Sequence, residues 1–267
     1  MSLKNKLLLD SVFSYQNNIF YQSNFRHPSF EQAYLKLREK EDRIYDDSVV
    51  KQLPEFNKNH PYKKEWDMRK STLHFLIEYL RKIESLQYIM ELGCGNGWLA
   101  HNLAVSLSSE ICAVDVNETE LLQGARVFKD IPNLSFVYTD IFSSALKSQK
   151  FNAIVLAGSV QYFRDLRALI LRLAEFTESH GKIYIADSPF YSSPADALAA
   201  RKRSVTHFTS LGFPEMADQY FHHTLDELKD FDYKIVYNPK SAVTLIKRKI
   251  FRRSSSVFPI LCINFKN

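Results

Sequence analysis

The sequence predicts an α/β fold, a doubly wound and mostly parallel sheet with a helical N-terminal extension. Five short apolar runs rich in Val, Ile and Tyr lie between residues 87 and 188, and stretches of helical character separate them. The runs are almost continuously hydrophobic, which is typical of parallel strands that helices cover on both faces. Regular alternation of such strands with helices indicates a doubly wound sheet.

Composition supports a globular protein. The chain has 267 residues, 45% of them hydrophobic and 24% charged, which excludes a disordered chain, a collagen-like repeat and a coiled coil. No apolar run of about 18 residues occurs, so we expect no membrane span, and the N-terminus lacks the pattern of a secretory signal. Three cysteines, Cys94, Cys112 and Cys262, fit neither a disulfide framework nor a zinc site and favour the reducing cytoplasm.

Residues 1–85 are expected to form a helical extension that acts as a lid. Two segments, 29–47 and 60–86, carry apolar residues near helical spacing. In the second segment one apolar face is predicted to face the core; it consists of Trp66, Leu73, Leu76, Ile77 and Leu80.

Residues 86–267 are expected to form the main domain. Its first five strands are predicted at 87–92, 110–116, 134–141, 151–158 and 181–188, with helices at 98–108, 118–130 and 165–180 between them. Gly181 is interpreted as the stop of the last of these helices.

The alternation ends after residue 188. Residues 189–223 are long, aromatic and interrupted by prolines, so we expect an insertion that forms a substrate lid, with a helix at 195–204. Thr224 and Glu227 stand in capping-box register for a helix at 224–231. Strands follow at 233–239 and 260–266. A basic run at 245–253 is interpreted as a solvated loop, with a nucleic-acid or membrane patch as the alternative.

A glycine-rich turn follows the first predicted strand. The chain contains only 7 glycines, and Gly93, Gly95 and Gly97 alternate in one short loop before a helix that starts near Trp98. Such a loop at the carboxyl end of a parallel strand opens a crevice in which ligands bind, with helix N–H groups facing it. The spacing matches neither the dinucleotide fingerprint G-x-G-x-x-G nor a Walker A loop.

An acidic residue directly precedes this loop. Glu91 would repel a pyrophosphate, whereas a ligand with an ammonium group would gain from a nearby carboxylate. Cys94, inside the loop, is interpreted as a small filler because no base accompanies it at a set spacing. The loop therefore predicts a ligand other than a dinucleotide.

Carboxylates end the next two predicted strands. Asp115 follows the glycines at a distance close to the roughly 20 residues that separate a sugar-binding acid from the loop in dinucleotide folds, and it could accept both ribose hydroxyls. Capping of the next helix is its alternative role. Asp140, followed by the apolar Ile141, could bind the exocyclic amine of adenine or cap a turn. Ala157 and Gly158 leave room at the end of the fourth strand.

These motifs together resemble a known family. In this order, ELGCGNG (91–97), AVDVN (113–117), YTDIF (138–142) and FNAIVLAGSVQYF (151–163) look like the motifs of class I S-adenosylmethionine-dependent methyltransferases. The resemblance covers residues 87–190 well and the C-terminal part more loosely. It implies a Rossmann-like sheet of seven strands in which 260–266 is the reversed last strand, paired with 233–239.

The resemblance also implies the cofactor, S-adenosylmethionine. The glycine loop would wrap the methionine part, Asp115 would hold the ribose, and Asp140 with Ile141 would face adenine. The expected cofactor-binding residues are Glu91, Gly93, Cys94, Gly95, Asn96, Gly97, Asp115, Val116, Asp140, Ile141 and Ala157.

The expected reaction is methyl transfer to a small molecule, with a secondary metabolite as one option. Relatives that methylate the amino groups of bases carry an Asp/Asn-Pro-Pro-Tyr/Phe motif where this chain has AGSVQYF, so nucleic acid is disfavoured as a partner. Tyr162, Tyr191 and His222 are candidate substrate-pocket residues. No metal site and no catalytic residue are predicted, because displacement at a sulfonium carbon needs alignment first and a base only for some acceptors.

Several alternatives stay open at this point. The acceptor could be a protein or RNA, or the chain could be a catalytically silent scaffold that binds the cofactor. A nicotinamide-dependent oxidoreductase is disfavoured by the glycine spacing and by Glu91. The sequence determines neither the methylated atom nor whether the protein forms a homo-oligomer.

Overall fold

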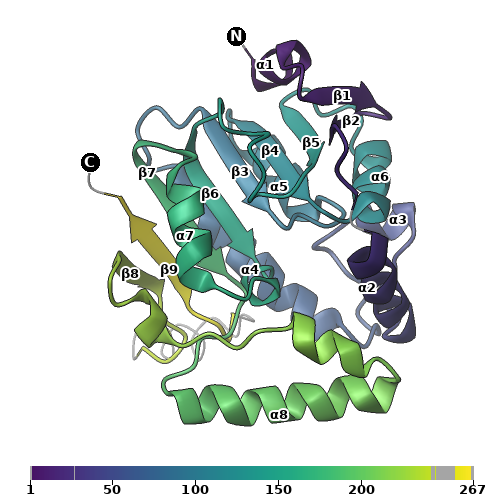
Figure 1. The fold of residues 1–267 in the computed structure, drawn as a ribbon, viewed down its shortest axis with the longest axis vertical. Coiled ribbons are helices and arrows are strands. Elements are labelled where there is room, and N and C mark those ends of the chain that lie inside the picture. Colours follow the sequence, from purple (N-terminus) through teal and green to yellow (C-terminus); the bar gives the residue numbers. More distant parts are fainter. Residues whose placement is uncertain (1, 27, 242–243, 245–255, 266–267) are drawn as a thin grey trace.

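A computed structural model describes residues 2–26, 28–241, 244 and 256–265, without the side chains of residues 28–30. Helices cover both faces of a central sheet (Figure 1), which confirms the α/β class. Within the described ranges, nine strands form this sheet in the order β1-β2-β5-β4-β3-β6-β7-β9-β8. The strands are β1 (Phe13–Gln16), β2 (Ile19–Gln22), β3 (Tyr88–Leu92), β4 (Glu110–Asp115), β5 (Leu134–Tyr138), β6 (Phe151–Ala157), β7 (Thr177–Ala186), β8 (Asp232–Tyr237) and β9 (Ile260–Asn264).

Helices and 3-10 turns connect these strands. They are α1 (Leu3–Leu9), α2 (Pro28–Lys40), α3 (Asp47–Val50), α4 (Lys63–Leu80), α5 (Trp98–Ser106), α6 (Glu118–Val127), η1 (Val160–Tyr162), α7 (Leu166–Ala174), α8 (Pro194–Leu211), η2 (Pro214–Gln219) and η3 (Leu225–Leu228). The capping box of Thr224 and Glu227 is confirmed, although the helix that it starts is a short 3-10 turn. None of the described helices is both long and apolar enough to cross a membrane.

The parallel part of the sheet agrees with the sequence prediction. β2, β5, β4, β3, β6 and β7 run parallel, and β9 lies antiparallel between β7 and β8. Ile263 of β9 pairs with Ile183 of β7 on one side and with Tyr233 of β8 on the other. The reversed C-terminal strand and its pairing with 233–239 are therefore confirmed.

Two strands of the sheet come from the N-terminal extension, which we expected to be helical. β1 and β2 form a hairpin, and β2 pairs in parallel with β5, so the sheet has nine strands instead of seven. The turn consists of Asn17 and Asn18, whose φ values are 50° and 62°. Asparagine tolerates this left-handed conformation, which the favoured two-residue hairpin turn requires, so the sequence NN between two aromatic runs was the overlooked signal.

The predicted helix 165–180 was too long. α7 ends at Ala174, and β7 begins at Thr177, which pairs with Phe151. Gly181 lies inside β7 at a register shift, where a Cβ atom would come within 2.9 Å of the carbonyl oxygens of Glu178 and Phe151. This glycine permits close approach of the backbone at an irregular place in the strand, so its interpretation as a helix stop was wrong.

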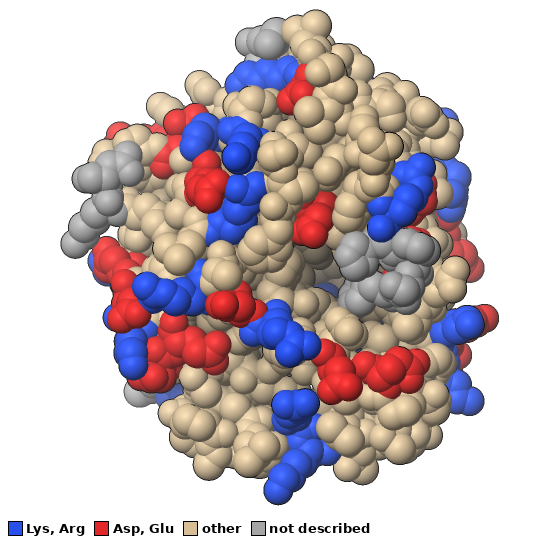
Figure 2. All heavy atoms as spheres, in the orientation of Figure 1, with Lys and Arg blue, Asp and Glu red and all other residues tan. Residues whose placement is uncertain are grey.

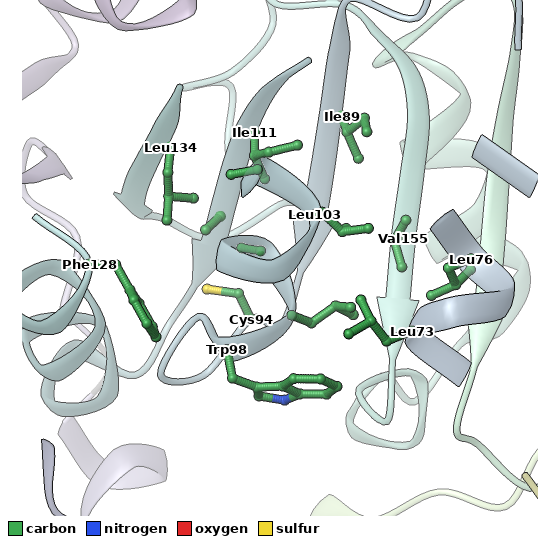
Figure 3. Packing of buried hydrophobic residues seen from close by; sticks show 14 of the residues in the cluster. Leu73, Leu76, Ile89, Cys94, Trp98, Leu103, Ile111, Phe128, Leu134 and Val155 are labelled. Atoms are coloured by element: carbon green, nitrogen blue, oxygen red, sulfur yellow. The ribbon is translucent and has the colours of Figure 1, made fainter. Parts of the chain in front are cut away.

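The core lies in two layers, one on each face of the sheet. On one face, α4 and α5 pack their leucines, including Leu73, Leu76 and Leu103, onto strand residues such as Ile89 and Val155 (Figure 3). The five apolar residues predicted to face inward from the second helical segment are all buried. α1 and α7 cover the opposite face.

A third, smaller cluster joins segments that are far apart in the sequence. Leu37 of α2 packs with Phe208 of α8 and with Met216 and Ala217 of η2, and we call α2, α8 and η2 together the cap. α2 is fastened to the main domain because the Glu31 carboxylate accepts hydrogen bonds from the N–H (2.8 Å) and hydroxyl (2.6 Å) of Thr119. α8 lies beyond the end of the sheet to which β6 points (Figure 1).

The fold makes a prediction about Gly97, which starts α5. Its φ is +73°, and a Cβ atom there would lie 2.5 Å from the ring of Phe136. Gly212 has φ +88° but no neighbouring atom within 4 Å. We expect Gly212→Ala to cost about 1–2 kcal/mol for backbone strain alone, and Gly97→Ala about 1–3 kcal/mol more because of the overlap. Urea unfolding measures both, and equal losses would contradict this packing.

Candidate functional site

A cavity of about 280 Å³ opens where the parallel strands end. Its volume is near the lower end of the range of small-ligand sites, about 300–1,000 Å³. Its walls come from the ends of four neighbouring strands and from the cap. The lining residues are Leu92, Gly93 and Gly95 at the end of β3; Asp115, Val116, Asn117 and Glu120 at the end of β4 and the start of α6; Thr139, Asp140, Ile141 and Phe142 after β5; Gly158, Ser159, Tyr162 and Phe163 after β6; and Tyr34 and Gln219 of the cap.

The glycine loop is held against the end of β4. The N–H groups of Gly93 and Cys94 both donate to the carbonyl oxygen of Val114, at 2.8 and 3.2 Å. Gly93 has φ +75°, and a Cβ atom on it would lie 2.4 Å from the Cβ of Ser159. Both the positive φ of Gly93 and its close approach to Ser159 require glycine at this position, so the backbone without a side chain forms part of the cavity wall.

Asp115 links the loop to its own strand end. One carboxylate oxygen, Oδ2, accepts the N–H of Gly95 at 2.7 Å, and the other, Oδ1, accepts the N–H groups of Val116 and Asn117 at 2.7 and 2.9 Å. Burial raises the pKa of Asp115, and the three amides oppose this rise. Asn117, not Asp115, caps α6, because its side chain accepts the N–H of Glu120. Asp115 is only partly buried and faces the cavity.

Glu120 is a second carboxylate in the cavity wall, and sequence reasoning missed it. It stands in the first turn of α6 and receives a hydrogen bond from Nδ2 of Asn117 at 3.1 Å. Burial and the charge of Asp115 raise its pKa to about 7, against the opposing effect of Arg38. The available signal was its position three residues after the N-cap of the helix that follows β4, where a side chain faces the crevice.

The end of β5 supplies a polar and an apolar wall. Asp140 lies two residues beyond the strand, and its carboxylate accepts the N–H of Phe142 at 2.9 Å, which is the turn-capping role weighed as its alternative. Its side chain nevertheless lines the cavity, next to the buried Ile141. Asp140 and Ile141 therefore suit a ligand that has a polar edge and a flat apolar face.

Glu91 and Cys94, which were also expected to bind the cofactor, lie behind the cavity wall. Glu91 is 2% exposed and packs against α5, with the N–H of Ala100 as its backbone partner, and its Oε2 has no hydrogen-bond partner in the described part of the chain. Burial raises its pKa well above the usual range. Cys94 lies in the core beneath α5 (Figure 3), where burial also raises its pKa, so its thiol is a poor nucleophile.

The remaining loop residues shape the backbone. Asn96 accepts the N–H of Trp98 through its side chain at 3.3 Å, and Gly97 is the N-cap of α5. Ala157 ends β6, but the neighbouring Gly158 and Ser159 reach the cavity in its place.

Of the three substrate-pocket candidates, only Tyr162 lines this cavity. Its hydroxyl oxygen accepts a hydrogen bond from Arg38 of α2 at 2.9 Å, and burial raises its pKa. Arg38 also pairs with Glu41 at 2.8 Å. Tyr34 and Arg38 were missed because they come from the N-terminal extension, which reaches the site only through tertiary packing.

The other two candidates lie in or beside a second hollow, of about 310 Å³, which residues of α8 help to line. His222 lines it, and the ring centroid of Tyr191 is 5.8 Å from that of His222. An Nε2 contact with Ser204 at 3.0 Å holds the imidazole, whose pKa is lowered by burial and by Arg201. Neither residue lines the cavity of Tyr162, although the ring of Tyr220 contacts both Tyr162 and His222, with centroids 5.7 and 5.3 Å away.

Charged side chains of both signs are mixed on the surface. In Figure 2, Lys and Arg are interspersed with Asp and Glu over the face of the molecule that is seen in Figure 1. The basic run 245–253 lies outside the described residues. Within the described ranges, no group of three or more His, Cys, Asp or Glu is placed to hold a metal ion.

Comparison with known proteins points to one family. Residues 89–181 match a family model described as a methyltransferase domain. A protein of Mycobacterium tuberculosis named as an uncharacterized methyltransferase is 26% identical over 99 residues, which cover 37% of this chain and 49% of that protein. An O-methyltransferase of Pyrenophora dematioidea is 22% identical over 122 residues, 44% of this chain and 46% of that protein. The chain thus spans about half the length of these curated relatives.

Solved structures share the fold. The YcgJ protein from Bacillus subtilis superposes with a TM-score of 0.55 at 12% identity, over 73% of this chain and 98% of that one. The plantazolicin methyltransferase BpumL, in complex with a triazolic desmethylPZN analog and SAH, superposes with a TM-score of 0.53 at 15% identity, over 90% of this chain and 99% of that one.

The half-buried Glu120 predicts that the stability of the protein depends on pH. Its pKa of about 7 lies above the ordinary 4.5, so between these pH values the folded state keeps a proton that the unfolded state releases. The free energy of unfolding therefore falls as pH rises through this window, by about 1–2 kcal/mol after allowance for partial exposure. In urea denaturation, the free energy of unfolding of Glu120→Gln should rise relative to that of the wild type as the pH is raised from 5 to 8. A constant difference between the two proteins would contradict the raised pKa.

The family match and the cavity fall on the same segment. Residues 89–181 contain the glycine loop, Asp115, Glu120, Asp140 and Tyr162, and they form the parallel centre of the sheet. This segment therefore matches a methyltransferase domain, and its motifs resemble those of the class I S-adenosylmethionine-dependent methyltransferases.

Proposed function

We propose that this protein transfers a methyl group from S-adenosylmethionine to a small-molecule acceptor. One observation carries the proposal: the bare backbone of Gly93 and Gly95 and the carboxylate of Asp115 face the same cavity, whose wall includes two residues of the cap. The cavity offers close backbone approach, an acceptor for sugar hydroxyls and an excess of negative charge. A ribonucleoside with a cationic sulfur needs all three.

The lining residues suit the parts of this cofactor. Gly93 and Gly95 would lie along its amino-acid part, Asp115 would hold the ribose, and Asp140 with Ile141 would face adenine. Asp115 and Glu120 would attract the positive charge of the sulfonium group. When bound, the cofactor supplies a methyl group that is already activated by that charge.

The protein's part in the reaction is alignment and the exclusion of water. α2, fastened through Glu31, and η2 contribute Tyr34 and Gln219 to the cavity wall, and Tyr162 and Phe163 line it after β6. Arg38 fixes the Tyr162 hydroxyl, so this wall has one defined arrangement. Holding the reacting atoms in line in a dry site removes much of the barrier for a displacement.

A small acceptor is favoured over a protein or RNA. Tyr34 of α2 and Gln219 of η2 form part of the cavity wall, so a polymer would have to reach the site past the cap. The names of two relatives, an O-methyltransferase and a plantazolicin methyltransferase bound to a desmethylPZN analog, are in keeping with this reading.

Three free, buried cysteines support a reducing compartment such as the cytoplasm.

Asp115→Ala tests the placement of the cofactor. Loss of a charged hydrogen-bond acceptor should weaken S-adenosylmethionine binding by about 1–3 kcal/mol, or about 5- to 150-fold in Kd. Isothermal titration calorimetry measures this change. Asp130→Ala removes the same charge from an exposed position outside the cavity and should leave Kd unchanged. Equal affinity for the wild type and Asp115→Ala would contradict the placement.

Turnover tests the reaction itself. With radiolabelled S-adenosylmethionine, we expect label to enter members of a panel of small phenols, carboxylic acids and amines, and not bulk protein or RNA. Label found only in protein or RNA would show that the acceptor is a polymer and not a small molecule. Binding of the cofactor without transfer to any acceptor would favour the silent scaffold.

A further inference from the structure

We propose that Glu120 is a second acceptor for the ribose hydroxyls of the cofactor, so that two carboxylates instead of one bind the sugar diol. This inference rests on the proposed function and extends it to a residue of α6. It also changes the role expected for Asp115, which would accept only one of the two hydroxyls.

The two carboxylates flank the same glycine. Gly95 donates its N–H to Asp115 at 2.7 Å, and a Cβ atom built on Gly95 would lie 3.3 Å from Oε2 of Glu120. Both carboxylates line the cavity. A ligand that lies along the bare Cα of Gly95 therefore meets both of them.

Asn117 sets the spacing of this pair. Its N–H donates to Asp115 at 2.9 Å, its Nδ2 donates to Glu120 at 3.1 Å, and its Oδ1 caps the N–H of Glu120. Asn117 as a whole is 2% exposed, so packing fixes its side chain in place. The pair is thus ordered before any ligand arrives, which lowers the entropic cost of binding.

Counting acceptor sites separates the roles of the two acids. An ionised carboxylate offers about four lone-pair sites, and three of those on Asp115 are taken by the amides of Gly95, Val116 and Asn117. About one site is left for a diol that has two hydroxyl protons to place. Glu120 receives a single hydrogen bond from the described part of the chain, so it has room for the second hydroxyl.

The electrostatics agree with this division. Other charged groups near Glu120 are Arg38 and Glu31 of α2, besides Asp115. Burial and Asp115 together raise the pKa of Glu120 to about 7. A carboxylate that is short of hydrogen-bond donors gains from a hydroxyl that donates to it, and a cationic ligand reduces the repulsion between the two acids.

The test measures binding of S-adenosylhomocysteine and of its 2′-deoxy and 3′-deoxy analogues by calorimetry. Glu120→Ala should weaken S-adenosylhomocysteine by about 5- to 50-fold, and Glu120→Gln, which keeps a neutral acceptor oxygen, should lose less. For one deoxy analogue the loss should shrink to less than about 2-fold, because its missing hydroxyl no longer needs Glu120. Glu118→Ala is the matched control, since Glu118 also lies in the first turn of α6 but near Tyr21, outside the cavity.

Each other outcome has its own meaning. Unchanged affinity in both Glu120 variants would overturn the inference and leave the methyltransferase proposal intact. An equal loss for the parent compound and both deoxy analogues would assign Glu120 a structural role and overturn it as well. If the wild type binds neither S-adenosylhomocysteine nor S-adenosylmethionine, the proposed function fails, and the inference fails with it.

Discussion

The hydrogen bond from the Gly95 N–H to the Asp115 carboxylate holds the candidate site together. It joins the glycine loop after β3 to the end of β4, at the edge of the sheet where parallel strands end. Without it, the loop would lose its side-chain anchor, and Asp115 would keep only the amides of its own turn. Burial makes a lone carboxylate costly here, so the amide donors are needed to keep it charged beside the cavity.

The rest of the site is built around this bond in layers. Packing of α4 and α5 beneath the loop leaves Glu91 and Cys94 in the core, outside the lining of the cavity. Above the loop, α2 supplies Tyr34 to the cavity and Arg38 to Tyr162, and α8 and η2 hold α2 in place through the small cluster around Leu37. Under the proposed function, the main domain would bind the cofactor, and the cap together with Tyr162 and Phe163 would enclose the acceptor.

Sequence reasoning predicted most of the sheet and the loop, because both depend on local pattern. The continuous apolar strands, the alternating glycines and the acids at strand ends are all visible in the chain. Two features were missed: the hairpin at Asn17 and Asn18, and the position of Gly181 inside a strand. The sequence pattern of such short segments is compatible with both a helix and a strand, and only pairing within the sheet selects one of them. Glu120 was overlooked although its position three residues after an N-cap was a usable signal, whereas Arg38 could not be assigned because it reaches Tyr162 only through tertiary packing.

The most direct test of the central claim uses the seven glycines of the chain as reporters. In a spectrum of protein labelled with ¹⁵N-glycine, titration with S-adenosylmethionine should shift the amide signals of Gly93, Gly95 and Gly158, which line the cavity. Signals of Gly181 and Gly212, which lie outside it, should stay in place. Saturating ligand that leaves the loop glycines unmoved, or that shifts only the distant ones, would contradict a cofactor site at the end of β3.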